Sequence, residues 1–150
     1  MTLPLSLISQ LSQTQDVSVL EDDDWIPGVD PKKSWFRLLY FSAETGVWAV
    51  VFRWNKGFVA PKHKHLGSSH SYILKGELAL REQRFPVGAY LFEANGSVHD
   101  ATEALVDTEY LFIGTGPLAF YCEQGELTGL FGWEEALAFK RKHDSHKAVS

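Results

Sequence analysis

The chain has 150 residues, of which 45% are hydrophobic and 22% charged, a balance that suits one folded domain and excludes a disordered chain. The formal net charge of −5 offers no basic surface for phosphate contacts, so nucleic-acid binding is not expected. A single cysteine, Cys122, rules out an internal disulfide, and no stretch is predicted to span a membrane or to act as a signal peptide. We therefore expect a cytoplasmic protein with neither membrane nor nucleic-acid partners.

The first 33 residues are predicted to form a lead-in that packs on the main domain or on a neighbouring subunit, and residues 34–150 to form that single domain. From residue 34 onward, short runs rich in aromatic and β-branched residues alternate with turn residues. These runs are 35–41, 47–54, 71–75, 77–81, 89–93, 108–113, 118–122 and 127–131. Their close spacing is typical of an antiparallel sandwich or barrel, and we expect an all-β fold.

The segment WEEALAFKRKH, residues 133–143, has a helical pattern instead. Trp133, Ala136 and Leu137 fall on one face, and acidic residues precede basic ones, as the helix dipole favours. We expect one C-terminal α-helix on the outside of the barrel.

Four of the six histidines lie between residues 63 and 99. His63 and His65 are two residues apart, so a strand at this point would turn both side chains to the same face. Two imidazoles on one face can share a divalent cation. The pair alone is weak, because surface histidines also occur at this spacing by chance.

The surrounding residues strengthen the interpretation. Residues 57–76, GFVAPKHKHLGSSHSYILKG, resemble the first motif of the cupin superfamily, and residues 88–99, GAYLFEANGSVH, resemble the second, with Ala94 where proline is usual. The resemblance implies a double-stranded β-helix, or jelly-roll barrel. It also implies a metal site formed by His63, His65 and His99.

Within this superfamily, the chain resembles the ChrR-like cupin group and, in particular, dioxygenases that cleave a carbon–carbon bond in ketones such as acetylacetone or dihydroxyacetophenone. The likeness includes TGVWAVVF, GTGPLAF and GELTGLFGWEEA, which lie outside the metal motifs. It implies a three-histidine iron site supported by Arg81, Glu93 and Thr102. Glu93 could orient a ligand histidine. Alternatively, Glu93 is a surface acid and Arg81 a solvated charge at a strand end.

The chain departs from many cupins at the fourth ligand position, where glutamate is common and this sequence offers Ser69 or His70. Serine is a poor ligand. His70 could be a fourth ligand, a proton-moving residue of the pocket or a loop cap, and we favour a pocket residue close to the metal. The residues Phe58, Tyr72, Phe92, Tyr110, Phe112 and Phe120 are candidates for an apolar pocket wall or for ordinary core packing.

Three neutral imidazoles leave the charge of a divalent cation uncompensated and leave coordination positions open for an anionic ketone and O₂. We therefore expect an Fe²⁺ dioxygenase acting on a small diketone or aryl hydroxyketone. Two alternatives stay open: a Zn²⁺, Ni²⁺ or Mn²⁺ hydrolase, isomerase or lyase, and a cupin that senses a metal or ligand without catalysis. The resemblance also implies a homodimer or homotetramer.

Overall fold

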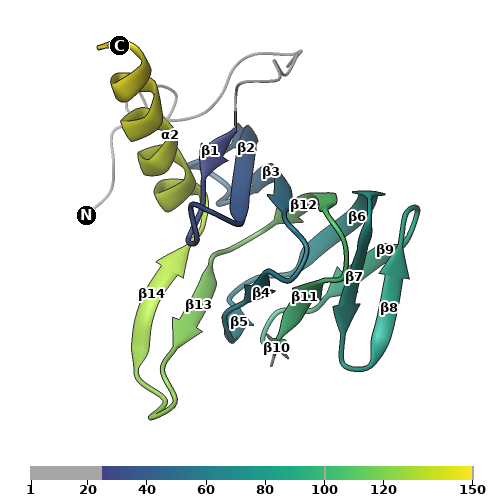
Figure 1. The fold of residues 1–150 in the computed structure, drawn as a ribbon. Coiled ribbons are helices and arrows are strands. Elements are labelled where there is room, and N and C mark those ends of the chain that lie inside the picture. The colour runs from purple at the N-terminus through teal and green to yellow at the C-terminus, as the bar shows by residue number, and fades with distance from the viewer. Residues whose placement is uncertain (1–24, 100, 150) are drawn as a thin grey trace.

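The structure is a computed structural model that describes residues 25–99 and 101–149. The described chain folds into fourteen strands followed by the C-terminal helix α2 (Figure 1). All described strand pairs are antiparallel, and the all-β prediction is confirmed. Most of the predicted lead-in, residues 1–24, lies outside the described residues.

The largest sheet has six strands in the order β1-β2-β3-β12-β6-β9. Burial alternates along its central strand β12, because successive side chains of a strand point to opposite faces. One face therefore packs into the interior and the other faces outward. The bounds are β1 (Ile26–Pro27), β2 (Ser34–Phe41), β3 (Trp48–Trp54), β12 (Thr108–Gly114), β6 (Ser69–Lys75) and β9 (Tyr90–Glu93).

Two four-stranded sheets complete the barrel, in the orders β10-β5-β13-β14 and β4-β11-β7-β8. Several of their strands are only two or three residues long, which is why they do not stand out as apolar runs in the sequence. The first sheet contains β10 (Val98–His99), β5 (His63–His65), β13 (Leu118–Tyr121) and β14 (Leu127–Phe131). The second contains β4 (Val59–Ala60), β11 (Thr102–Ala104), β7 (Glu77–Leu80) and β8 (Gln83–Pro86).

One hydrophobic cluster joins the three sheets. Trp48 and Phe36 of the large sheet are fully buried, and both rings lie 5.5 Å from the ring of Phe131 on β14. Leu78 on β7 and Ala104 on β11 belong to the same cluster. The interior is therefore dominated by aromatic rings, and the candidate site opens into it.

Helix α2 (Trp133–Lys147) begins at the predicted residue and runs four residues beyond the predicted end. The carboxylate of Glu135 accepts a hydrogen bond of 2.9 Å from the Gly132 backbone N–H, which satisfies one exposed donor at the helix start. Ala136 is buried, and Trp133 stacks on Phe41 of β2. The helix packs on the outside of the barrel, as predicted, and it does so beside β1, β2 and β14 (Figure 1).

No helix within residues 25–99 and 101–149 combines the length and the apolarity needed to cross a bilayer.

The hairpin between β7 and β8 has a two-residue turn, Arg81–Glu82, since Leu80 pairs with Gln83. Both turn residues have positive φ, 50° and 65°, as the tight turns that match strand twist require. Neither is glycine, so the backbone here is strained. The turn decides where the Arg81 side chain begins, which matters for the site below.

Candidate metal centre

His63 and His65 lie on β5 with both rings turned into the barrel. Their side chains are buried, with exposed fractions of 8% and 2%, and the half-buried Lys64 between them belongs to the other face of the strand. The ring centroids are 5.2 Å apart. This is the arrangement that the two-residue spacing predicts for a strand.

The hydrogen bond at His63 fixes which ring nitrogen can bind a cation. The Nδ1 atom lies 2.8 Å from the carbonyl oxygen of Pro61. Because a carbonyl oxygen only accepts, Nδ1 carries the hydrogen in this contact, and a neutral ring then has its lone pair on Nε2. Metal-binding histidines are commonly held in this way, with the second nitrogen donating to a backbone carbonyl.

His65 takes part in a short chain of contacts with Ser69 and Glu93. The Ser69 hydroxyl donates to Oε2 of Glu93 at 3.1 Å and lies 3.2 Å from Nδ1 of His65. When the hydroxyl hydrogen goes to the carboxylate, Ser69 accepts the Nδ1 hydrogen of His65, which is the tautomer that leaves Nε2 for a cation. Nε2 of His65 then faces Oε2 of Glu93 at 3.1 Å.

This contact places a lone pair of a neutral imidazole against a carboxylate oxygen in a buried position. Two acceptors at such a distance repel each other unless a positive charge lies between or beside them. Either a proton on Nε2 or a metal cation supplies that charge. The residues present thus fit a divalent cation, with nitrogen donors from β5 and the negative charge of Glu93 on β9 beside them.

The predicted third ligand, His99, lies on β10 in register with His63 on β5. Directly opposed positions of an antiparallel pair lie on the same face of a sheet. The side chain of His99 lies outside what the structure describes. Among the side chains that it does describe, no three His, Cys, Asp or Glu residues gather closely enough to complete a metal site.

The predicted supporting residues lie in different places. Glu93 and Thr102 line the cavity beside the two histidines, so Glu93 is not the outward-facing surface acid that the alternative proposed. Arg81 is exposed in the hairpin turn and does not line the cavity. Its guanidinium donates a 2.6 Å hydrogen bond to the carbonyl oxygen of Val98, the residue before His99. Arg81 therefore contacts the strand that carries the third histidine, and not the cavity itself.

The structure corrects the expected location of His70. Its neighbours Ser69 and Ser71 are buried on the inner face of β6, so alternation places His70 on the outer face, where its Nδ1 bonds the Tyr90 hydroxyl. Its ring lies 5.1 Å from that of Phe92. His70 is thus neither beside the metal position nor a residue of the pocket.

The same alternation corrects part of the expected aromatic wall. Tyr72 and Phe92 follow the outward register and are 45% and 57% exposed. The other expected wall residues, Phe58, Tyr110, Phe112 and Phe120, do line the cavity.

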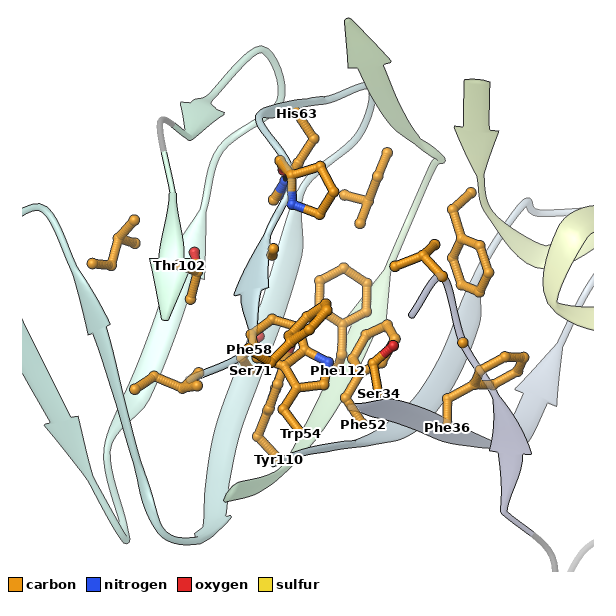
Figure 2. A pocket seen from close by; sticks show the side chains of 18 of the residues that line it. Ser34, Phe36, Phe52, Trp54, Phe58, His63, Ser71, Thr102, Tyr110 and Phe112 are labelled. Atoms are coloured by element: carbon orange, nitrogen blue, oxygen red, sulfur yellow. Dashed lines mark hydrogen bonds between the residues drawn. The ribbon is translucent and has the colours of Figure 1, made fainter. Parts of the chain in front are cut away.

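The cavity that contains the histidines has a volume of about 90 Å³ and a mainly apolar wall with several aromatic rings (Figure 2). Phe52 and Trp54 of β3, together with Phe131 of β14, extend this wall beyond the rings that the sequence identified. Such a space takes up a small, largely apolar molecule with a few polar groups.

Tyr110 is a titratable group on this wall. Burial raises the pKa of its phenol well above the ordinary value, and the negative charge of Glu93 raises the pKa further. The hydroxyl therefore stays protonated and remains a hydrogen-bond donor across the physiological range.

Sequence reasoning missed the parts played by Ser69 and Ser71. Ser69 was dismissed as a poor ligand, although it connects His65 to Glu93. Ser71 lines the cavity two residues further along the same face. The available signal was the period of two in β6, which places residues 69 and 71 on one face.

Comparison with known proteins places this geometry in a family. A family model described as the ChrR Cupin-like domain matches residues 13–119. The acetylacetone-cleaving enzyme of Acinetobacter johnsonii is 31% identical over an alignment of 107 residues, with 67% of this chain and 70% of that protein covered.

Two crystal structures share the fold. An acetylacetone dioxygenase from Acinetobacter johnsonii matches with a TM-score of 0.79 and 24% identity over 87% of this chain and 93% of that one. An RmlC-like cupin protein from Ralstonia eutropha JMP134 matches with a TM-score of 0.77 and 15% identity over 87% and 88% of the two chains. The predicted cupin barrel is confirmed.

Proposed function

Because the chain belongs to the ChrR cupin-like family, we propose that it is a metal-dependent non-haem Fe(II) dioxygenase that cleaves a carbon–carbon bond in a small diketone or aryl hydroxyketone. The observation that carries the proposal is the buried contact of 3.1 Å between Nε2 of His65 and Oε2 of Glu93, two residues that line the cavity. The names of the relatives support the reaction class.

In this proposal His63, His65 and His99 hold the cation. The Pro61 carbonyl and the Ser69 hydroxyl fix the two β5 rings so that Nε2 of each is the metal-binding atom. The register of β10 against β5 brings His99 to the position opposite His63.

When bound, Fe(II) would supply open coordination positions for the two substrate oxygens and O₂, and would act as a Lewis acid on the substrate. Glu93 Oε2, which lies at the histidines, is placed to accept the proton that a diketone loses on becoming an enolate. The aromatic wall excludes water from the anion formed there, and the cavity volume of about 90 Å³ suits a small substrate.

The test begins with metal analysis of untagged protein, followed by reconstitution of metal-free protein with Fe(II), Zn(II), Ni(II) or Mn(II). Oxygen uptake is then recorded with acetylacetone and with a dihydroxyacetophenone. We expect uptake with at least one compound in the Fe(II) form alone. His63→Ala should lose the metal, whereas Lys64→Ala, which changes the intervening residue on the other face of β5, should retain it.

Iron retention without oxygen uptake for any diketone or hydroxyketone would reject the dioxygenase and leave the metal-binding cupin. Activity of the Zn(II), Ni(II) or Mn(II) form without O₂ consumption would instead support a hydrolase, isomerase or lyase. Failure of the wild-type protein to bind any of these metals would reject the site itself.

A further inference from the structure

Two hydroxyl groups on the cavity wall have no part in the metal centre described above. Tyr110 on β12 and Ser71 on β6 are 6% and 7% exposed, and both line the cavity. Within the described residues, neither hydroxyl hydrogen-bonds to another protein group. Neither oxygen is among the fully enclosed polar atoms, so both hydroxyls open to the cavity and can hydrogen-bond a molecule that enters it.

Strand register separates Tyr110 from the metal centre. Ser69 pairs with Glu93 at the histidines, and along β6 the next inward residue, Ser71, pairs with Phe112. Tyr110 pairs with the following inward residue, Ile73, four residues from the Ser69 row. At 3.3 Å per residue the backbone of Tyr110 is about 13 Å along the strand from that row, although its phenol still feels the charge of Glu93. Figure 2 shows the same order, with His63 and Tyr110 at opposite ends and Ser71 and Phe112 between them.

The surroundings of Tyr110 make its hydroxyl a fixed donor. Its ring packs 5.0 Å from Trp54 and 5.3 Å from Phe52, measured between ring centroids, which limits its movement. Burial keeps the phenol protonated, as described above. A rigid donor in an apolar wall favours a ligand with an acceptor at that point and disfavours one without it.

We propose that the hydroxyl of Tyr110, with Ser71 beside it, forms a polar subsite that binds an oxygen of the substrate other than the two that chelate the metal. This inference rests on the proposed function, since it assumes a substrate anchored at the histidines. It narrows the substrate class to ketones that carry a third oxygen, such as an ether, hydroxyl or carbonyl, on the arm that reaches into the aromatic end of the cavity.

The test compares two probes of equal size, heptane-2,4-dione and 1-methoxypentane-2,4-dione, which differ by an ether oxygen in place of one methylene group. Binding is measured by calorimetry on the Zn(II)-loaded protein under argon. We expect the wild-type protein to favour the methoxy probe by about 3- to 10-fold, the range of one neutral hydrogen bond. Tyr110→Phe should lower this preference by about 3- to 10-fold. Any intrinsic difference in chelation between the probes is common to both proteins and cancels when their two affinity ratios are compared.

The matched control is Tyr72→Phe, which removes a hydroxyl from the outer face of the same sheet and should leave the ratio unchanged. Ser71→Ala is a second variant of the subsite and should lower the ratio by a smaller factor. Thermal unfolding and metal content of each variant establish that it is folded and loaded.

An equal preference in wild-type protein and Tyr110→Phe, with both probes binding, overturns the subsite and leaves the proposed function intact. If neither probe binds to protein that retains Zn(II), the proposed function fails and the subsite fails with it. A lost preference in Tyr72→Phe would show that the effect is not local to the cavity and would also overturn the proposal.

Discussion

Replacing Ser69 by alanine tests the contact chain at the candidate metal centre. The hydroxyl is 1% exposed and connects Nδ1 of His65 to Oε2 of Glu93. Its loss leaves a buried N–H without its acceptor, which costs about 1–3 kcal/mol of folding stability. For a chain of this length each kcal/mol lowers the melting temperature by about 2–4 °C. We expect metal-free Ser69→Ala to melt lower by an amount within these limits.

The same change should also weaken metal binding, because Ser69 holds His65 in the tautomer that leaves Nε2 for the cation. Loss of such a partner typically lowers metal affinity by about 10- to 100-fold. Competition of Zn(II) between the protein and a chromophoric chelator measures the affinity, and calorimetric melting of metal-free protein measures the stability.

Ser71→Ala is the matched control for metal binding, since Ser71 lies on the same face of β6 and is equally a buried serine. Among the described residues it makes no hydrogen bond to the histidine rings, so Zn(II) affinity should stay near that of the wild-type protein. Equal Zn(II) affinities for the two alanine variants would refute the role given to Ser69.

Three further expectations follow from the backbone and the charges. Gly76→Ala should lower the free energy of unfolding, measured in urea, by more than Gly57→Ala. Both glycines have φ of +81°, so the backbone cost of alanine is shared. An added Cβ at Gly76 would collide with the β11–β12 connection, whereas the space beside Gly57 is open. The difference should be about 1–3 kcal/mol. Tyr110→Phe should lose less stability than the wild-type protein at alkaline pH. The raised pKa of Tyr110 keeps the phenol protonated in the folded state, whereas the phenol of the unfolded chain ionises above pH 10.0. In urea titrations above that pH, the wild-type free energy of unfolding should therefore fall by about 1.4 kcal/mol per pH unit relative to the variant. Arg81→Met, which removes the donor to the Val98 carbonyl, should weaken Zn(II) retention in chelator competition by about tenfold.

The sequence predicted the features that depend on local rules. The spacing of His63 and His65 gave a shared face, and the acidic-to-basic order from Trp133 gave the start and direction of α2. The cupin motifs also predicted that His99 approaches the pair, and the register of β10 brings its backbone opposite His63. Each of these follows from periodicity or from a motif whose spacing fixes the fold.

The errors arose where a one-residue choice reverses the face of a strand. The apolar run at 71–75 does not say whether its odd-numbered or even-numbered residues face inward. In the structure the odd-numbered residues of β6 face inward, which turns His70 and Tyr72 outward. Exposure followed register and not hydrophobicity, because the aromatic residues of β6 and β9 lie on the outer face whereas Tyr110 and Phe112 of β12 lie on the inner face. Residue type alone could not separate the wall of the cavity from the outer surface.

The position of the carboxylate follows from pairing between strands. In many cupins a glutamate follows the histidine pair directly, and this chain has Ser69 in that region. Ser69 pairs with Glu93 across the β6–β9 ladder, so a carboxylate from a strand some twenty residues later reaches the same histidine. Ser69 then connects the two residues, since its hydroxyl donates to the Glu93 carboxylate and accepts from the His65 ring. The fourth ligand position therefore has no glutamate in the sequence around it, whereas the strand that pairs with β6 supplies the carboxylate of Glu93.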